Sequence, residues 1–200
     1  MGMDEPTPPL SAFDIVALVA SAGGLPALAA VLSGLPVDFP AAVVVLQHLD
    51  PSRPSLLTKI LRQHSTLPVY EARQGDRLCP GAVFVAPPAH HLLVDAHGEL
   101  SLTETERVHY VRPSADTLLE SIARGFGPRA VAVVLTGSGT DGADGVRIVK
   151  RMGGTVIAQD RPTSRSFGMP GAAIRTGCVD SVLPLGEIAP ALVHLVNTSA

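Results

Sequence analysis

The sequence has few charged residues and little net charge. Only 16% of its 200 residues are Asp, Glu, Lys or Arg, and the formal net charge is -3. So small a charged fraction argues against a disordered chain or a coiled coil. A nearly neutral chain also offers no broad electrostatic attraction to nucleic acid or to a membrane surface. We therefore expect neither as a partner.

Cysteines and long apolar runs are also scarce. Two cysteines, Cys79 and Cys178, cannot build a disulfide framework and suit a reducing compartment. The N-terminus lacks the basic region and apolar stretch of an export signal. The longest apolar runs, such as Ala130–Leu135, are far shorter than the roughly 20 residues that span a bilayer. We expect a cytoplasmic protein without membrane insertion.

What the chain does contain is typical of one tightly turned globular domain. Apolar residues make up 46%, accompanied by 19 glycines and 18 prolines, in a length that can bury a sizeable core. Residues 1–12 carry acids and three prolines, which predicts a flexible N-terminal tail. No repeat or low-complexity linker divides the rest, so we expect a single domain over residues 13–197.

Short apolar runs alternate with helical patterns along this domain. The runs at 14–20, 41–46 and 130–135 are apolar almost throughout, as in strands covered on both faces. Their alternation with helices predicts an α/β fold with a doubly wound, mainly parallel sheet sandwiched by helices. Residues 94–100 predict a small antiparallel hairpin that turns near His97 and Gly98. Further strands are expected at 69–71, 83–86, 155–158 and 179–182, and helices from Pro26, over 54–63, after Ser114, around 146–152 and over 184–196.

Three polar residues follow strands that this fold would place in one sheet. Ser21 and His48 come just after two buried strands, and Asp141 lies in the glycine-rich loop after a third; ligands of open parallel sheets bind beyond those carboxyl ends. A serine hydroxyl needs a base to become a nucleophile, and histidine can take and return the proton near neutral pH. A carboxylate orients the imidazole and stabilises its charged form. The three residues therefore predict a hydrolytic triad.

Each member of this triad also has a purely structural interpretation. Ser21 lies in a glycine-rich turn before a helix, where serine commonly satisfies backbone donors. Asp141 could cap the helix that follows it, with Asp144 in the first turn. His48 could be a hydrogen-bonded histidine at the end of a strand.

A dinucleotide-binding site is a competing hypothesis. Gly137, Gly139 and Gly142 fit the G-x-G-x-x-G fingerprint after a strand and before a helix, and Asp160 lies where an acid would hold a ribose. Against it, Asp141 would put negative charge where pyrophosphate needs free N–H groups. The chain that follows is also short for a full cofactor domain. We expect no cofactor.

Four histidines gather in the hairpin region, but their spacing matches no metal motif. His90, His91, His97 and His109 are not accompanied by an H-E-x-x-H sequence or by paired C-x-x-C motifs. We interpret them as exposed loop histidines and expect no metal site.

Six ordered segments together resemble one known family. The chain between about residues 13 and 196 closely resembles the catalytic domain of CheB-type chemotaxis protein-glutamate methylesterases. The segments are VASAGG (19–24), LQHL (46–49), RPSAD (112–116), LTGSGTDGA (135–143), IAQD (157–160) and FGMP (167–170).

The resemblance implies a serine carboxylesterase that hydrolyses glutamyl methyl esters on the cytoplasmic helices of chemoreceptors and releases methanol, with glutamine deamidation in some members. It implies Ser21 as nucleophile, His48 as base and Asp141 as the orienting acid. Backbone N–H groups, those of Ala22 and Ser138, are expected to hold the oxyanion. The family fold is similar to the doubly wound sheet with a hairpin predicted above.

The sequence departs from the family in three places. Ala20 stands where a glycine is usual, which adds a methyl group before the turn of Ser21. Arg161 and Arg165 lie where an acid and apolar residues are usual. Most members also carry a receiver domain, and only about a dozen residues precede the first strand here, so we expect a stand-alone form or control by a separate receiver protein. A catalytically impaired module that docks on receptors or other partners is the alternative.

Overall fold

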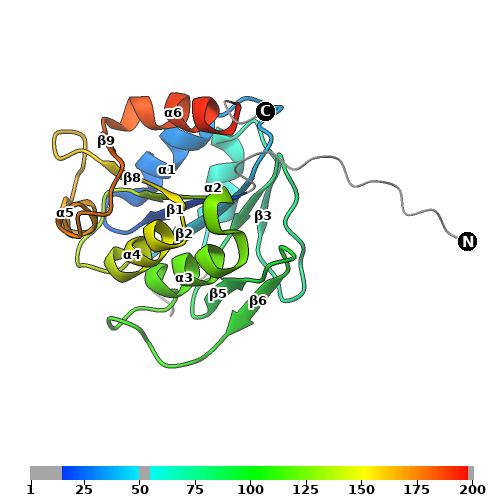
Figure 1. Cartoon of the computed structure of the whole chain (residues 1–200). Coiled ribbons are helices and arrows are strands. Elements are labelled where there is room, and N and C mark those ends of the chain that lie inside the picture. Colours follow the sequence, from blue (N-terminus) through cyan, green and yellow to red (C-terminus); the bar gives the residue numbers. More distant parts are fainter. Residues whose placement is uncertain (1–14, 50–54, 198–200) are drawn as a thin grey trace, which may run out of the picture.

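The protein is described by a computed structural model over residues 15–49 and 55–197. Its centre is a seven-stranded, entirely parallel sheet in the order β3-β4-β2-β1-β7-β8-β9 (Figure 1). The predicted tail at residues 1–12 lies outside the described residues. The strands are β1 Ile15–Ala20, β2 Ala42–Gln47, β3 Val69–Glu71, β4 Val83–Val85, β7 Ala130–Val134, β8 Thr155–Gln159 and β9 Ser181–Leu183.

Helices cover both faces of this sheet, which confirms the doubly wound prediction (Figure 1). One face carries α1 Gly24–Ser33, α2 Leu57–His64 and α6 Leu185–Asn197. The other carries α3 Ala115–Phe126, α4 Ala143–Arg151 and α5 Gly168–Arg175, together with the antiparallel hairpin of β5 His91–Val94 and β6 Leu100–Thr103. A short 3₁₀ helix, Gly127–Arg129, joins α3 to β7.

The central strand β1 explains why its sequence is apolar throughout. Successive side chains of a strand point to opposite faces. Ile15, Ala17 and Val19 therefore pack beneath α3 and α4, while the alternate residues pack beneath α1. All six residues of β1 are fully buried.

Most predicted elements are confirmed, with shifts at their ends. The hairpin turns at Gly98, whose φ of 77° suits glycine, and α2 begins at Leu57, whereas its predicted start at 54 lies outside the described residues. Helix α5 was not predicted, because its sequence GMPGAAIR is short and rich in weak helix formers. No helix in the described part of the chain is long and apolar enough to cross a membrane.

Candidate active site

The register of the central strands brings Ser21 and His48 together. Ala20 of β1 pairs with Gln47 of β2, so the next residue of each strand occupies a neighbouring position at the carboxyl edge of the sheet. The His48 N–H donates to the Ala20 carbonyl at 3.1 Å, and the Ser21 N–H donates to the Thr136 carbonyl at 3.0 Å. Adjacent strands lie about 4.8 Å apart, so Ser21 and His48 are backbone neighbours.

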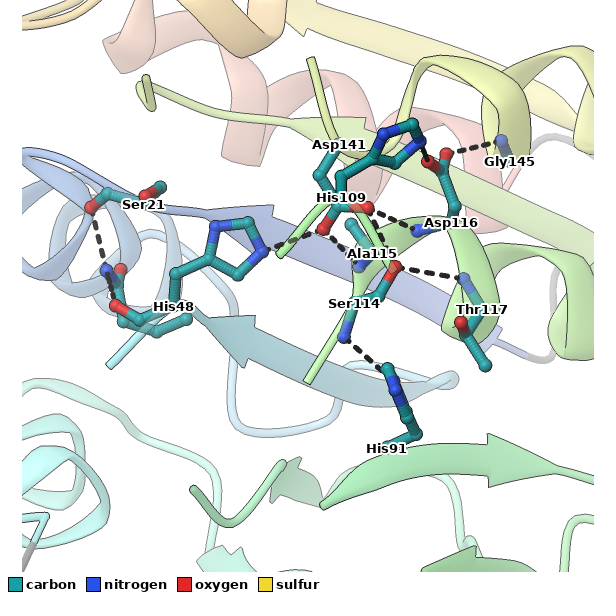
Figure 2. A network of polar contacts seen from close by, with 11 residues as sticks. Ser21, His48, His91, His109, Ser114, Ala115, Asp116, Thr117, Asp141 and Gly145 are labelled. Carbon is teal, nitrogen blue, oxygen red and sulfur yellow. Dashed lines mark hydrogen bonds and ion pairs between the residues drawn. The ribbon is translucent and has the colours of Figure 1, made fainter. Parts of the chain in front are cut away.

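His48 contacts Asp141 directly. Its Nε2 lies 2.8 Å from Asp141 Oδ2, and the carboxylate residue is only 4% exposed. Figure 2 shows Ser21 and Asp141 on opposite sides of the imidazole ring. The second ring nitrogen, Nδ1, lies on the side of Ser21. The Ser21 hydroxyl makes no hydrogen bond to another described residue, so the capping role considered for it is not observed in this part of the chain.

The carboxylate of Asp141 sits at the N-terminus of α3. Its Oδ1 accepts from Ser114 Oγ at 2.7 Å and the Asp116 N–H at 3.2 Å, and its Oδ2 also accepts the Ala115 N–H at 2.6 Å (Figure 2). The alternative in which Asp141 caps the following helix is wrong, because Gly142 is the N-cap of α4 and makes no side-chain cap. The O–H and N–H donors at the start of α3 therefore stabilise the negative charge of Asp141 next to the imidazole.

These contacts keep Asp141 ionised despite its burial. Burial raises the pKa of this carboxyl, but hydrogen bonds from His48, the Ala115 N–H and Ser114 outweigh burial and set its pKa below the usual value. Its neighbour Asp116 behaves in the opposite way. Burial raises the pKa of Asp116 to about 6, in spite of the bond from the Gly145 N–H, and the charge of Asp141 adds to the rise.

A small cavity opens beside His48. Its volume is about 80 Å³, and it is lined by His48, Leu49, Arg107 and the four residues from Tyr110 to Pro113. Tyr110, which lines this cavity, is 93% exposed. The cavity is suited to a small group next to the imidazole.

Comparison with known proteins identifies the family. A family model described as CheB methylesterase matches residues 16–192. The chain belongs to the CheB methylesterase family. A crystal structure of the Thermotoga maritima CheB methylesterase catalytic domain superposes with a TM-score of 0.88 at 39% identity, covering 92% of this chain and 99% of that one.

Two curated relatives of this CheB-family chain carry both activities in their names. Proteins from Moorella thermoacetica and Anaeromyxobacter dehalogenans, named protein-glutamate methylesterase/protein-glutamine glutaminase (the second numbered 2), are 43% and 47% identical to it. The alignments cover 92% of this chain in both cases, but 44% and 54% of the relatives. The chain thus spans about half the length of the curated relatives it matches.

Two supporting residues of this CheB-family site were not predicted. Gln47 Nε2 donates to the Ser21 carbonyl at 2.7 Å and so holds the turn of the serine. His91 was interpreted as an exposed loop histidine, which is wrong: it is fully buried in β5. Its Nδ1 accepts the Ser114 N–H at 3.2 Å, and its Nε2 therefore donates to the Glu106 carbonyl at 3.0 Å. The four residues of β5, HLLV, do not alternate between apolar and polar, so the sequence offered no signal for this burial.

The departure at Ala20 is accommodated by the packing. The Ala20 methyl group is fully buried, and a Cβ at Gly24 would lie 2.7 Å from it. A Cβ there would also lie 2.0 Å from Gln47 Oε1. Glycine at 24 therefore leaves room for both side chains, and β1 keeps its register with β2 to the last pair.

Replacing Gly137 by alanine is expected to displace Ser21. A Cβ at Gly137 would lie 2.3 Å from Met169 Sδ and 2.9 Å from Ser21 Cβ, so one of the two must move. Since misplacement of a reacting group by about 1 Å can cost about 10²-fold in rate, we expect a loss of that order in ester hydrolysis. Gly186→Ala is the matched control, because a Cβ there meets nothing within 4 Å. Equal activities of the two variants would contradict this role of Gly137.

Proposed function

We propose that this chain is a serine carboxylesterase that hydrolyses glutamyl methyl esters on chemoreceptors. The observation that carries the proposal is the contact between His48 and the buried Asp141, next to a serine in the neighbouring strand position. A serine with a free hydroxyl, an imidazole and an ionised carboxylate in that order can perform acyl transfer. Membership of the CheB methylesterase family supports the choice of ester.

The hydrogen-bond pattern determines which imidazole nitrogen acts as the base. Because Nε2 of His48 donates to the Asp141 carboxylate, Nδ1 is the bare nitrogen of the neutral ring. Ser21 Oγ attacks the ester carbonyl and His48 Nδ1 takes its proton. The protonated ring then gives that proton to the departing methoxide, and methanol leaves. Water attacks the acyl-serine by the same route and yields the glutamate.

Backbone N–H groups at the same strand ends are proposed to stabilise the oxyanion. No acceptor within residues 15–49 and 55–197 is found for the N–H groups of Ala22 and Ser138. The loop of Ser138 is fixed beside the serine, because the Gly137 N–H donates to the Ser166 carbonyl at 2.9 Å and the Gly137 carbonyl accepts the Met169 N–H at 2.8 Å. Such rigid donors are worth about 10²–10³-fold each in rate.

The same machinery is suited to glutamine side chains. Attack on an amide instead of an ester would release ammonia and leave the same glutamate, and the names of the two relatives combine both activities. The proposed substrates are the cytoplasmic helices of receptors, so the expected cytoplasmic location is part of this proposal. Control by a separate receiver protein stays a prediction.

The direct test measures methanol. Receptor fragments carrying methyl-labelled glutamyl esters are incubated with the chain, and volatile label is collected over time. We expect release that depends on the amount of chain and leaves one new carboxylate per methanol. The receptors are fully methylated beforehand. If methanol is then released no faster with the chain than without it, the proposed activity is contradicted.

Arg165 is expected to favour acidic substrate helices. Its side chain lies on Gly23, two residues after the nucleophile, since a Cβ at Gly23 would come within 2.7 Å of it, and it is exposed. Each hydrolysed ester leaves a carboxylate on the receptor helix, which this guanidinium would attract. Arg165→Ala should raise KM several-fold at low salt and change kcat little, as expected for steering by an exposed charge.

A charge-matched variant tests whether the position of that cation matters. Arg151 ends α4 at the opposite edge of the sheet, so Arg151→Ala removes the same charge away from Ser21. The difference in KM between the two variants should vanish at high salt, where exposed charges are screened. Equal KM values for both variants at low salt would contradict the role of Arg165.

A further inference from the structure

Three side chains of the types that ligate metals, one imidazole and two carboxylates, converge beside the active site without taking part in the proposed reaction. His109 precedes α3, Asp116 lies in the first turn of α3, and Asp144 lies in the first turn of α4. His109 Nε2 is 3.2 Å from Asp116 Oδ2 and 3.9 Å from Asp144 Oδ2. One ligand atom from each residue lies within 4.8 Å of the others. Figure 2 shows His109 directed at the Asp116 carboxylate.

One oxygen of this cluster is buried without a hydrogen bond. Asp116 is only 8% exposed, and its Oδ1 accepts the Gly145 N–H at 2.7 Å. Its Oδ2 has no hydrogen-bond partner, although His109 Nε2 is close, because that contact lacks hydrogen-bond geometry. A buried carboxylate oxygen left in this way is costly. Two electron-pair donors that lie this close together without a hydrogen bond between them are typical of ligands that share a cation.

We propose that His109, Asp116 and Asp144 form a binding site for a divalent transition-metal ion, for which Zn²⁺ is the best-fitting probe. Zinc takes imidazole nitrogen and carboxylate oxygen at about 2.0–2.2 Å, which separates neighbouring ligand atoms of a tetrahedron by about 3.3 Å. The 3.2 Å separation already has this value, whereas the 3.9 Å separation and the one between Asp116 and Asp144, which is within 4.8 Å, would close as the ion binds. The remaining position is open to water, since His109 and Asp144 face solvent.

The charges around the cluster leave the ligand atoms available. Arg147 binds Asp144 through Oδ1 at 2.5 Å, so Oδ2, the oxygen nearest His109, is not the one that the guanidinium uses. Two carboxylates and a neutral imidazole then provide two negative charges for a divalent ion. This donor set of one nitrogen and two oxygens suits zinc and manganese better than calcium or a soft ion.

An ion at this place would connect three elements next to the reaction centre. The segment that carries His109 also carries Arg107 and Tyr110, which line the cavity beside His48. The backbone N–H of Asp116 donates to Asp141. The ion would therefore tie the rim of the active site to α3 and α4. This inference does not depend on the proposed esterase activity, because metal binding is measured without substrate.

The test is a calorimetric titration of the chelator-treated chain with Zn²⁺. We expect one ion per chain and a melting temperature that rises with Zn²⁺ concentration. His109→Ala and Asp144→Asn should each weaken binding by about tenfold or more, since even outer partners of metal ligands are typically worth about 10–100-fold in affinity. Both positions are exposed enough for the variants to fold, which circular dichroism without metal would verify.

His90→Ala is the matched control. His90 also faces a carboxylate, with its Nε2 3.1 Å from Glu104 Oε1, but it lies outside the cluster. Its variant should bind Zn²⁺ as the parent chain does. Binding that is unchanged in both His109→Ala and Asp144→Asn, that is lost in His90→Ala, or that does not saturate below millimolar Zn²⁺ would overturn the proposal.

Discussion

Ser21→Ala should abolish methyl ester hydrolysis while leaving the fold intact. The rate is expected to fall on the order of 10⁴–10⁶-fold, because removal of the nucleophile of a triad leaves only the contributions of binding and of oxyanion donors. The fold should persist, since the Cβ that packs against Gly137 is retained and the lost hydroxyl has no hydrogen bond to another described residue. Initial rates of methanol release and a thermal melt check the two halves of this prediction.

A remote serine provides the control for this variant. Ser33 lies at the end of α1, where its hydroxyl donates to the Ala30 carbonyl at 3.0 Å. Ser33→Ala should retain the parent rate. Hydrolysis that survives in Ser21→Ala at more than a few per cent would remove Ser21 from the reaction, even if the chain proved to be an esterase.

The fold and the strand ends could be predicted because they depend on local patterns. Buried parallel strands have apolar residues on both faces, so β1, β2 and β7 stand out in the sequence. Once the sheet is parallel, the residues after these strands must gather at one edge. That reasoning selected Ser21, His48 and Asp141, and the structure places them at the same edge.

The partners of these residues could not be predicted, because they depend on packing between distant segments. Asp141 lies 26 residues after Ala115, and no periodicity indicates that it would meet the first turn of α3 rather than cap α4. The same holds for Asp116 and His109, whose approach depends on how the segment before α3 folds back. Helix α5 was missed because tertiary contacts of Met169 stabilise a sequence with little helix propensity of its own.

Asp141→Asn is expected to cost about 10⁴-fold in rate, as the loss of the orienting carboxylate does in well-studied triads. The amide cannot stabilise the imidazolium that forms when His48 takes the serine proton. It also favours the wrong tautomer, because an amide nitrogen facing Nε2 would place the ring proton on Nδ1, where the base is needed. Rates of methanol release across pH, measured below the melting temperature of the variant, check this expectation.

The substitution should also lower stability, and the loss should depend on pH. The Asp141 carboxylate accepts from Ser114, the Ala115 N–H, the Asp116 N–H and His48, so an amide turns one acceptor into a donor that faces a backbone N–H. A buried mismatch of this kind costs about 1–3 kcal/mol. Because the pKa of Asp141 is lowered in the folded state, its stabilisation is present above the unfolded value of 3.8 and is lost as pH falls through the folded value. The difference in stability between parent and variant should therefore shrink in acid.

Ser114→Ala separates the two consequences of this change. It removes the N-cap of α3 and one hydrogen bond to Asp141, which costs about 1 kcal/mol, but it leaves the carboxylate against His48. If the Asp141 carboxylate acts on the imidazole, Ser114→Ala will lose stability of the same order and yet keep most of its rate. If Asp141 only stabilises α3, Asp141→Asn and Ser114→Ala will lose activity only to the extent that they unfold. Their rates will then be alike at a temperature where both are folded. Comparing the rates of methanol release of two variants with similar stability thus tests the His48–Asp141 contact separately from its effect on folding.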